Sequence, residues 1–119
     1  YNAAAKELIF GLKYLGILKG TIPQLLKKGA HKPYFPHGIG HSLGIDVHDA
    51  TPAGQEAVLK PGMVITIEPG LYFPKAIRPL PACGVRIEDD VLVTPRGHEV
   101  ITARAFPKEL KNILTLIEG

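Results

Sequence analysis

The sequence lacks the features that mark several large classes of protein. Its 119 residues include a single cysteine, Cys83, so no disulfide can form within the chain, which fits a reducing compartment such as the cytoplasm. No apolar run approaches the roughly 20 residues that a membrane-spanning helix needs. The first residues lack the basic-then-apolar order of a signal peptide. The basic residues are scattered and the net charge is only +3, so we expect neither a membrane nor a nucleic-acid partner.

The hydrophobic pattern predicts a mixed fold. The predicted elements are, in chain order, helices over 3–18 and 21–28, strands over 63–67, 85–94 and 99–102, and a helix over 108–117. Glycines interrupt residues 30–54, which favours short strand and loop pieces there, and the prolines of 74–83 predict a loop. Because loops rather than helices link the strands, we expect an α+β fold with an antiparallel sheet and helices on one face.

Histidines are concentrated in residues 37–49, which read HGIGHSLGIDVHD. In an extended conformation His37 and His41 would point to the same side of the chain. Neutral imidazole is a common ligand of transition metals, and an imidazole nearby can donate to developing oxyanion charge. A polar, glycine-rich turn with surface histidines explains the composition equally well.

Two glutamates lie in or beside predicted strands. Glu68 follows the apolar run 64–67, and a carboxylate at the end of a buried strand needs a partner or a metal. A strand-end glutamate that faces solvent is, however, the commoner case. Glu88 interrupts an apolar strand, where alternation places it on one face with Arg86 and Asp90. That face could be a metal site with its neighbours or only a solvated surface.

Considered together, His41, Glu68 and Glu88 form a plausible donor set. Carboxylates with few histidines suit Mn²⁺, Co²⁺, Zn²⁺ or Fe²⁺ better than a structural zinc site, which prefers cysteine and histidine. Three such side chains are too few to hold two metals, but they could hold one with an open position for water.

The segment 37–49 resembles the signature of the aminopeptidase P and proline dipeptidase (prolidase) family. Residues 67–72, IEPGLY, and 84–90, GVRIEDD, resemble the next two blocks of that family. The segments 15–20, LGILKG, and 30–37, AHKPYFPH, look specifically like bacterial-type Xaa-Pro aminopeptidase. Methionine aminopeptidases share the fold and the step from His41 to His48, but they lack the residues around Glu88.

The resemblance implies a two-metal hydrolase that cleaves the bond between an N-terminal residue and a following proline. The implied metal ligands are His41, Glu68 and Glu88, with Glu88 bridging two ions. Manganese is the expected metal, with Co²⁺, Zn²⁺ and Fe²⁺ as alternatives. The other implied site residues are His37 and His48 on the substrate side, Arg86 as a partner of the acids, and Glu68 in a second role as proton shuttle.

The sequence departs from the family in one respect. The family has two aspartate ligands upstream of the histidine, whereas residues 1–45 contain no aspartate. The chain does not begin with methionine, and it starts inside a helical pattern. We therefore expect residues 1–119 to be a fragment, the C-terminal half of a pita-bread catalytic domain, whose missing half carries the two aspartates.

Alone, this chain is expected to bind metal weakly, to lack peptidase activity and to form a homo-oligomer through exposed apolar surface. Two alternatives stay open. One is a catalytically dead pita-bread domain that binds peptides or proteins. The other is a prolidase, which cleaves only dipeptides.

Overall fold

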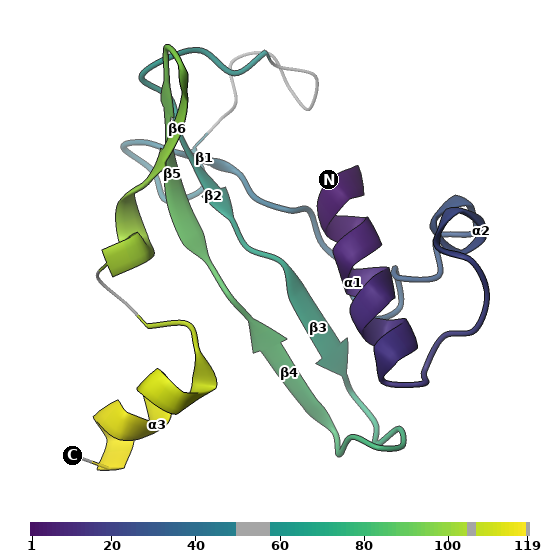
Figure 1. Ribbon diagram of the computed structural model, residues 1–119. Helices are drawn as coiled ribbons and strands as arrows, with labels where there is room; N and C mark the ends of the chain where they lie inside the picture. Colours follow the sequence, from purple (N-terminus) through teal and green to yellow (C-terminus); the bar gives the residue numbers. More distant parts are fainter. Residues whose placement is uncertain (50–57, 105–106, 119) are drawn as a thin grey trace. The chain divides into compact units, whose positions relative to one another are not determined.

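The computed structural model describes residues 1–49, 58–104 and 107–118 (Figure 1). The chain divides into two compact units, the first made of residues 1–39 and 68–86 and the second of 40–67 and 87–119. All strand pairs in the described ranges are antiparallel, in a four-stranded sheet and a separate two-stranded one. The predicted α+β class with antiparallel sheet is thus confirmed. Within these ranges no helix is both long and apolar enough to cross a membrane.

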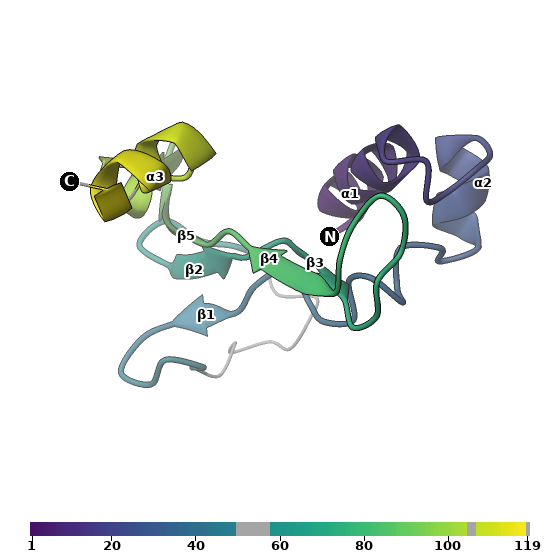
Figure 2. The ribbon, with the colours of Figure 1, turned by 90° about the horizontal axis from the view of Figure 1, so that it is seen from below.

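Two helices lie side by side in the first unit, α1 (Asn2–Tyr14) and α2 (Ile22–Lys27) (Figures 1 and 2). The buried side chains of α1 recur at helical spacing and comprise Ala5, Ile9 and Leu12. The predicted helix over 3–18 is too long, because α1 ends at Tyr14 and Gly16 adopts a φ of 75°, a left-handed conformation that favours glycine.

Helix α2, the counterpart of the predicted helix over 21–28, begins with a capping box at Thr21. The hydroxyl of Thr21 accepts the main-chain N–H of Gln24, and the side chain of Gln24 accepts the N–H of Thr21 in return. This reciprocal capping box satisfies two N–H groups that have no partner inside the helix.

A two-stranded ribbon completes the first unit (Figure 1). Strand β3 (Gly70–Phe73) pairs with β4 (Cys83–Arg86), from Gly70 opposite Arg86 to Phe73 opposite Cys83. Strand β3 is not among the predicted strands, because a Pro-Gly pair such as Pro69-Gly70 is typical of the end of a strand. Proline removes one N–H from the ladder, but pairing continues beyond it. The proline-containing stretch between these two strands is largely the predicted loop.

The second unit is built on a four-stranded sheet in the order β1-β2-β5-β6. Its strands are β1 (Ser42–Leu43), β2 (Val64–Ile67), β5 (Asp89–Thr94) and β6 (Gly97–Val100). A 3₁₀ helix, η2 (Ile101–Arg104), and the helix α3 (Leu110–Glu118) follow. On β2 and β5, Val64 pairs with Leu92 and Thr66 with Asp90.

Two of the predicted strands in this part of the chain have the wrong bounds. The single strand over 85–94 is two strands, because the ladder is interrupted at residues 87 and 88 and β4 and β5 belong to different sheets. The strand over 99–102 begins earlier, at Gly97, and gives way to η2 at Ile101. Of the glycine-rich stretch 30–54, residues 50–54 lie outside the described residues.

Candidate metal centre

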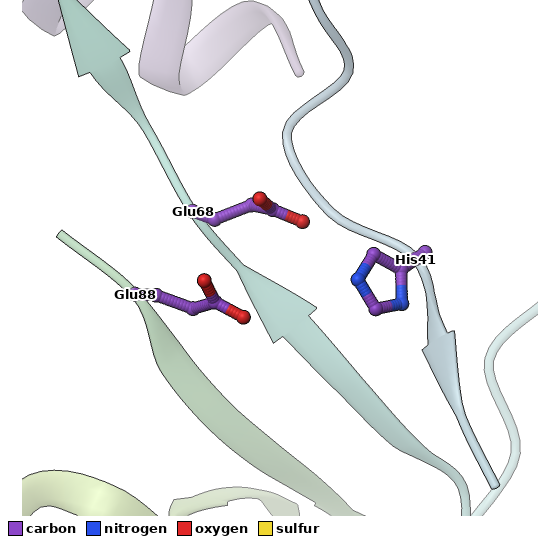
Figure 3. A group of neighbouring side chains, drawn as sticks. All are labelled: His41, Glu68 and Glu88. Carbon is purple, nitrogen blue, oxygen red and sulfur yellow. The ribbon is translucent and has the colours of Figure 1, made fainter. Parts of the chain in front are cut away.

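Three side chains from separate parts of the sequence converge in the structure. His41, Glu68 and Glu88 each offer one ligand atom, and these atoms all lie within 4.8 Å of one another (Figure 3). His41 and Glu88 directly precede β1 and β5, and Glu68 directly follows β2. His41 and Glu68 are half-buried, and Glu88 is exposed. These are the three residues that the resemblance implied as metal ligands.

The main chain holds two of these residues in register. The N–H of Thr66 donates to the carbonyl of His41 at 2.9 Å, and the N–H of Glu68 donates to the carbonyl of Ile39 at 2.7 Å. Both bonds continue the register in which Ser42 lies opposite Ile65. Because side chains alternate along a strand, Thr66 and Glu68 point to the same side of β2.

The imidazole of His41 is oriented for metal binding. Its Nδ1 lies 2.9 Å from the carbonyl oxygen of Ser42, and a carbonyl can only accept, so Nδ1 carries the proton. The lone pair of the neutral ring is then on Nε2, the atom that can bind a cation. The ring of His48 meets that of His41 edge to face, with 4.5 Å between centroids.

His37 is fixed by contacts at both of its ring nitrogens. Nδ1 lies 2.7 Å from the carbonyl of Gly38, and Nε2 lies 2.8 Å from the hydroxyl of Tyr72. The rings of Phe35 and Tyr72 both meet it edge to face, at 4.8 and 5.4 Å between centroids. The sequence prediction missed Tyr72. It lies within the segment 67–72 that carries the resemblance, but no local pattern connects it with His37.

Arg86 lies beside Glu68. Its Nε is 3.7 Å from Oε2 of Glu68. The Arg86 side chain is 52% exposed and that of Glu68 is 13% exposed, so solvent weakens this ion pair. Arg86 can partly neutralise Glu68 without binding it tightly.

A second polar cluster adjoins Glu88. The hydroxyl of Thr102 donates to Oδ1 of Asp89 at 2.7 Å and accepts the N–H of Asp90 at 3.1 Å. The ammonium of Lys108 lies 2.5 Å from the same Oδ1. Burial alone would raise the pKa of Asp89, but the hydrogen bonds from Lys108 and Thr102 and the charge of Lys108 lower it below its usual value. The sequence prediction did not include this cluster.

Residues 2–95 match the family model of metallopeptidase family M24, and the chain therefore belongs to this family of metallopeptidases. The chain is 45% identical over 114 residues to the Xaa-Pro aminopeptidase of Escherichia coli, covering 90% of the chain and 26% of that protein. It is 46% identical over 106 residues to human Xaa-Pro aminopeptidase 3, covering 86% of the chain and 20% of that protein. The predicted resemblance to bacterial-type Xaa-Pro aminopeptidase is confirmed.

Solved structures show the same fold. A Zn-substituted E. coli aminopeptidase P in complex with product matches with a TM-score of 0.88 at 43% identity, over 98% of this chain and 28% of that one. Proline aminopeptidase P II from Yersinia pestis matches with the same TM-score, identity and coverage. The predicted pita-bread architecture is therefore confirmed, and the chain spans about a quarter of the length of the relatives it matches.

Proposed function

We propose that this chain supplies three metal ligands, His41, Glu68 and Glu88, to a dinuclear Xaa-Pro aminopeptidase, and that Glu88 is shared between the two ions. The observation that carries the proposal is the convergence of one imidazole and two carboxylates within 4.8 Å. Nitrogen and oxygen donors without thiolate suit Mn²⁺, Co²⁺, Zn²⁺ or Fe²⁺, and we propose manganese as the physiological metal.

Three side chains do not satisfy two ions, so the site needs further ligands. We propose that residues 1–119 are the C-terminal half of the catalytic domain and that a preceding half contributes two aspartates. That half would then be the first partner of this chain. On this account the chain alone binds metal weakly and does not cleave peptides. Because Cys83 is exposed and free, we also propose a reducing compartment such as the cytoplasm.

The substrate class is peptides with proline in the second position. The bond before proline is a tertiary amide without an N–H, so recognition must depend on shape and on the carbonyl rather than on that donor. Bound divalent ions would polarise this carbonyl and lower the pKa of water toward neutrality. Glu68 would accept a proton from the attacking water, with Arg86 as its neighbouring partner.

His48 would bind the peptide and the negative charge that develops on its carbonyl oxygen. The edge-to-face contact between the rings of His48 and His41 supports this role, because it places His48 next to a proposed metal ligand. His37 would line the peptide side of the site, since both of its ring nitrogens already have partners in Gly38 and Tyr72. The ring of His37 is held by its contacts with Gly38, Phe35 and Tyr72. A ring that is already ordered loses little conformational entropy when substrate binds.

Calorimetric titration with Mn²⁺ tests the ligand set in this chain. We expect His41→Ala, Glu68→Gln and Glu88→Gln each to weaken binding at least tenfold, because each removes a ligand. The controls are His98→Ala and Glu99→Gln, which replace exposed residues of the same types on β6 and should bind as the unmodified chain does. Equal binding by the three ligand variants and the controls would refute the proposed site.

The substrate class is tested with the protein that includes its upstream sequence. It should hydrolyse a tripeptide such as Ala-Pro-Gly but not Ala-Ala-Gly, whereas residues 1–119 alone should hydrolyse neither. Cleavage of the dipeptide Ala-Pro without cleavage of the tripeptide would favour a prolidase. Metal binding without hydrolysis of any of these peptides would favour a peptide-binding domain.

A further inference from the structure

Thr66 is a buried polar residue next to the candidate metal centre. Its side chain is 2% exposed, and it lies in β2, two residues before Glu68. Its hydroxyl oxygen accepts the main-chain N–H of His41 at 3.0 Å, and its own N–H donates to the carbonyl of His41 at 2.9 Å. Thr66 therefore contacts both polar main-chain groups of His41.

One of these two bonds is unusual for a β-ladder. In a regular antiparallel pair of this type, two opposing residues exchange two main-chain N–H···O bonds. The register in which Ser42 faces Ile65 places His41 opposite Thr66. Here the N–H of His41 donates to the side-chain hydroxyl of Thr66. The position of the His41 main chain thus depends on the identity of a side chain on the neighbouring strand.

The approach of the two segments is close. A Cβ added to Gly40 would lie 1.8 Å from the carbonyl oxygen of Thr66 and 3.1 Å from its hydroxyl oxygen. Real Cβ atoms do not come that close to another heavy atom, so glycine at position 40 permits this contact. The main chain of residues 40 and 41 consequently lies directly against Thr66.

We propose that Thr66 is a positioning residue for metal binding, which acts by fixing the main chain of His41. The inference rests on the proposed function, in which His41 is a ligand. Because Nδ1 of His41 is tied to the adjacent carbonyl of Ser42, fixing the main chain on one side and the ring on the other sets the direction of Nε2. A metal ligand that is held in place in this way loses less freedom when the ion binds.

The proposal distinguishes the hydroxyl of Thr66 from its methyl group. Thr66→Val keeps the shape and removes the acceptor, whereas Thr66→Ser keeps the acceptor and removes the methyl. We expect Thr66→Val to weaken Mn²⁺ binding about tenfold to a hundredfold, as for other residues that orient metal ligands. Thr66→Ser should bind within about twofold of the unmodified chain, since its hydroxyl still accepts the His41 N–H. Thr94→Val, a substitution at the half-buried end of β5, is the matched control.

The experiment combines calorimetry with hydrogen exchange of the metal-free chain by NMR. Thr66→Val should speed exchange of the His41 amide relative to Thr66→Ser, and circular dichroism should show that both are folded. Equal metal binding and equal His41 exchange in the two variants would overturn the proposal, as would equal losses in both. If Thr66→Val does not fold, Thr66→Cys, whose sulfur is a weak acceptor, replaces it with the same expectations.

His41→Ala separates this inference from the function on which it rests. If His41→Ala abolishes binding and Thr66→Val does not weaken it, the ligand assignment survives and the role of Thr66 is refuted. If His41→Ala binds as tightly as the unmodified chain, the proposed metal site itself fails. The exchange of the His41 amide then still decides whether Thr66 fixes the main chain.

Discussion

The hydroxyl of Tyr72 and the imidazole Nε2 of His37 lie 2.8 Å apart, although 35 residues separate them in the sequence. The carbonyl of Gly38, which can only accept, faces Nδ1 of the same ring. In the neutral ring Nδ1 therefore carries the proton, and the phenol donates to Nε2. The pair joins the histidine-rich segment to strand β3.

Replacing Tyr72 with phenylalanine should therefore destabilise the chain. The variant loses one partly buried hydrogen bond, so the free energy of unfolding should fall by about 1 kcal/mol. Urea unfolding measures this loss. Tyr14→Phe is the control, because Tyr14 is 86% exposed, and it should leave the stability unchanged. Equal stabilities for the two variants would contradict the assigned hydrogen bond.

Acid should destabilise the chain through His31. This side chain is 2% exposed, its Nε2 meets the hydroxyl of Tyr1 at 3.0 Å, and no described residue forms a hydrogen bond with its Nδ1. Burial, and then the charge of Lys32, lower the pKa of His31. The unfolded chain takes up a proton near pH 6.5, and the folded chain does so only at lower pH. Stability is therefore complete above about pH 6.5 and falls as the pH falls below it.

His31→Gln should remove much of that pH dependence, whereas the exposed His98→Gln should retain it. Urea unfolding at a pH above and a pH below the usual histidine range provides the comparison. A chain that is equally stable at both pH values would show that His31 is not held neutral.

The cluster around Thr102 should stabilise the start of β5. The Thr102 hydroxyl both donates to Asp89 and accepts from Asp90, so Thr102→Val removes both hydrogen bonds and leaves Asp89 with Lys108 alone. We expect a loss of about 1–3 kcal/mol in the free energy of unfolding, measured in urea near neutral pH. Thr94→Val, on the same strand, should cost much less. A loss no greater than that of the control would contradict the role of the cluster.

Helix α3 should promote self-association of the chain. Its large apolar side chains that are at least one-third exposed are Leu110, Ile113, Leu114, Leu116 and Ile117. A contiguous apolar patch in water favours contact with another apolar surface. Sedimentation analysis should show association that increases with concentration, and Leu110→Lys with Ile117→Lys should reduce it. A monomer at all concentrations would contradict this expectation.

Local patterns predicted much of the fold because they follow local physical rules. The predicted helix over 3–18 contains Ile9 and Leu12, the buried residues of α1 at helical spacing, and the predicted helix over 21–28 starts at Thr21, the N-cap of α2. Strand β3 and the interruption at Glu88 were missed, since both depend on which distant segment supplies the ladder partners. Proline at position 69 indicates the end of a strand, because the sequence alone does not show that strand pairing resumes one residue later.

In the candidate site, too, local motifs predicted some residues, whereas contacts between distant segments could not be predicted. His41, Glu68 and Glu88 could be named from ordered sequence motifs, and the structure brings them together. Tyr72 and Thr66 could not be assigned their contacts from those motifs. The hydrogen bond from His41 to the Thr66 hydroxyl depends on strand register, which no local spacing specifies.

Anomalous X-ray scattering from crystals of this chain grown with Mn²⁺ tests the metal site most directly. The account predicts an anomalous peak that Nε2 of His41 and carboxylate oxygens of Glu68 and Glu88 contact together, and loss of that peak in Glu88→Gln. A manganese peak on other residues, or none among these three at saturating metal, would contradict it.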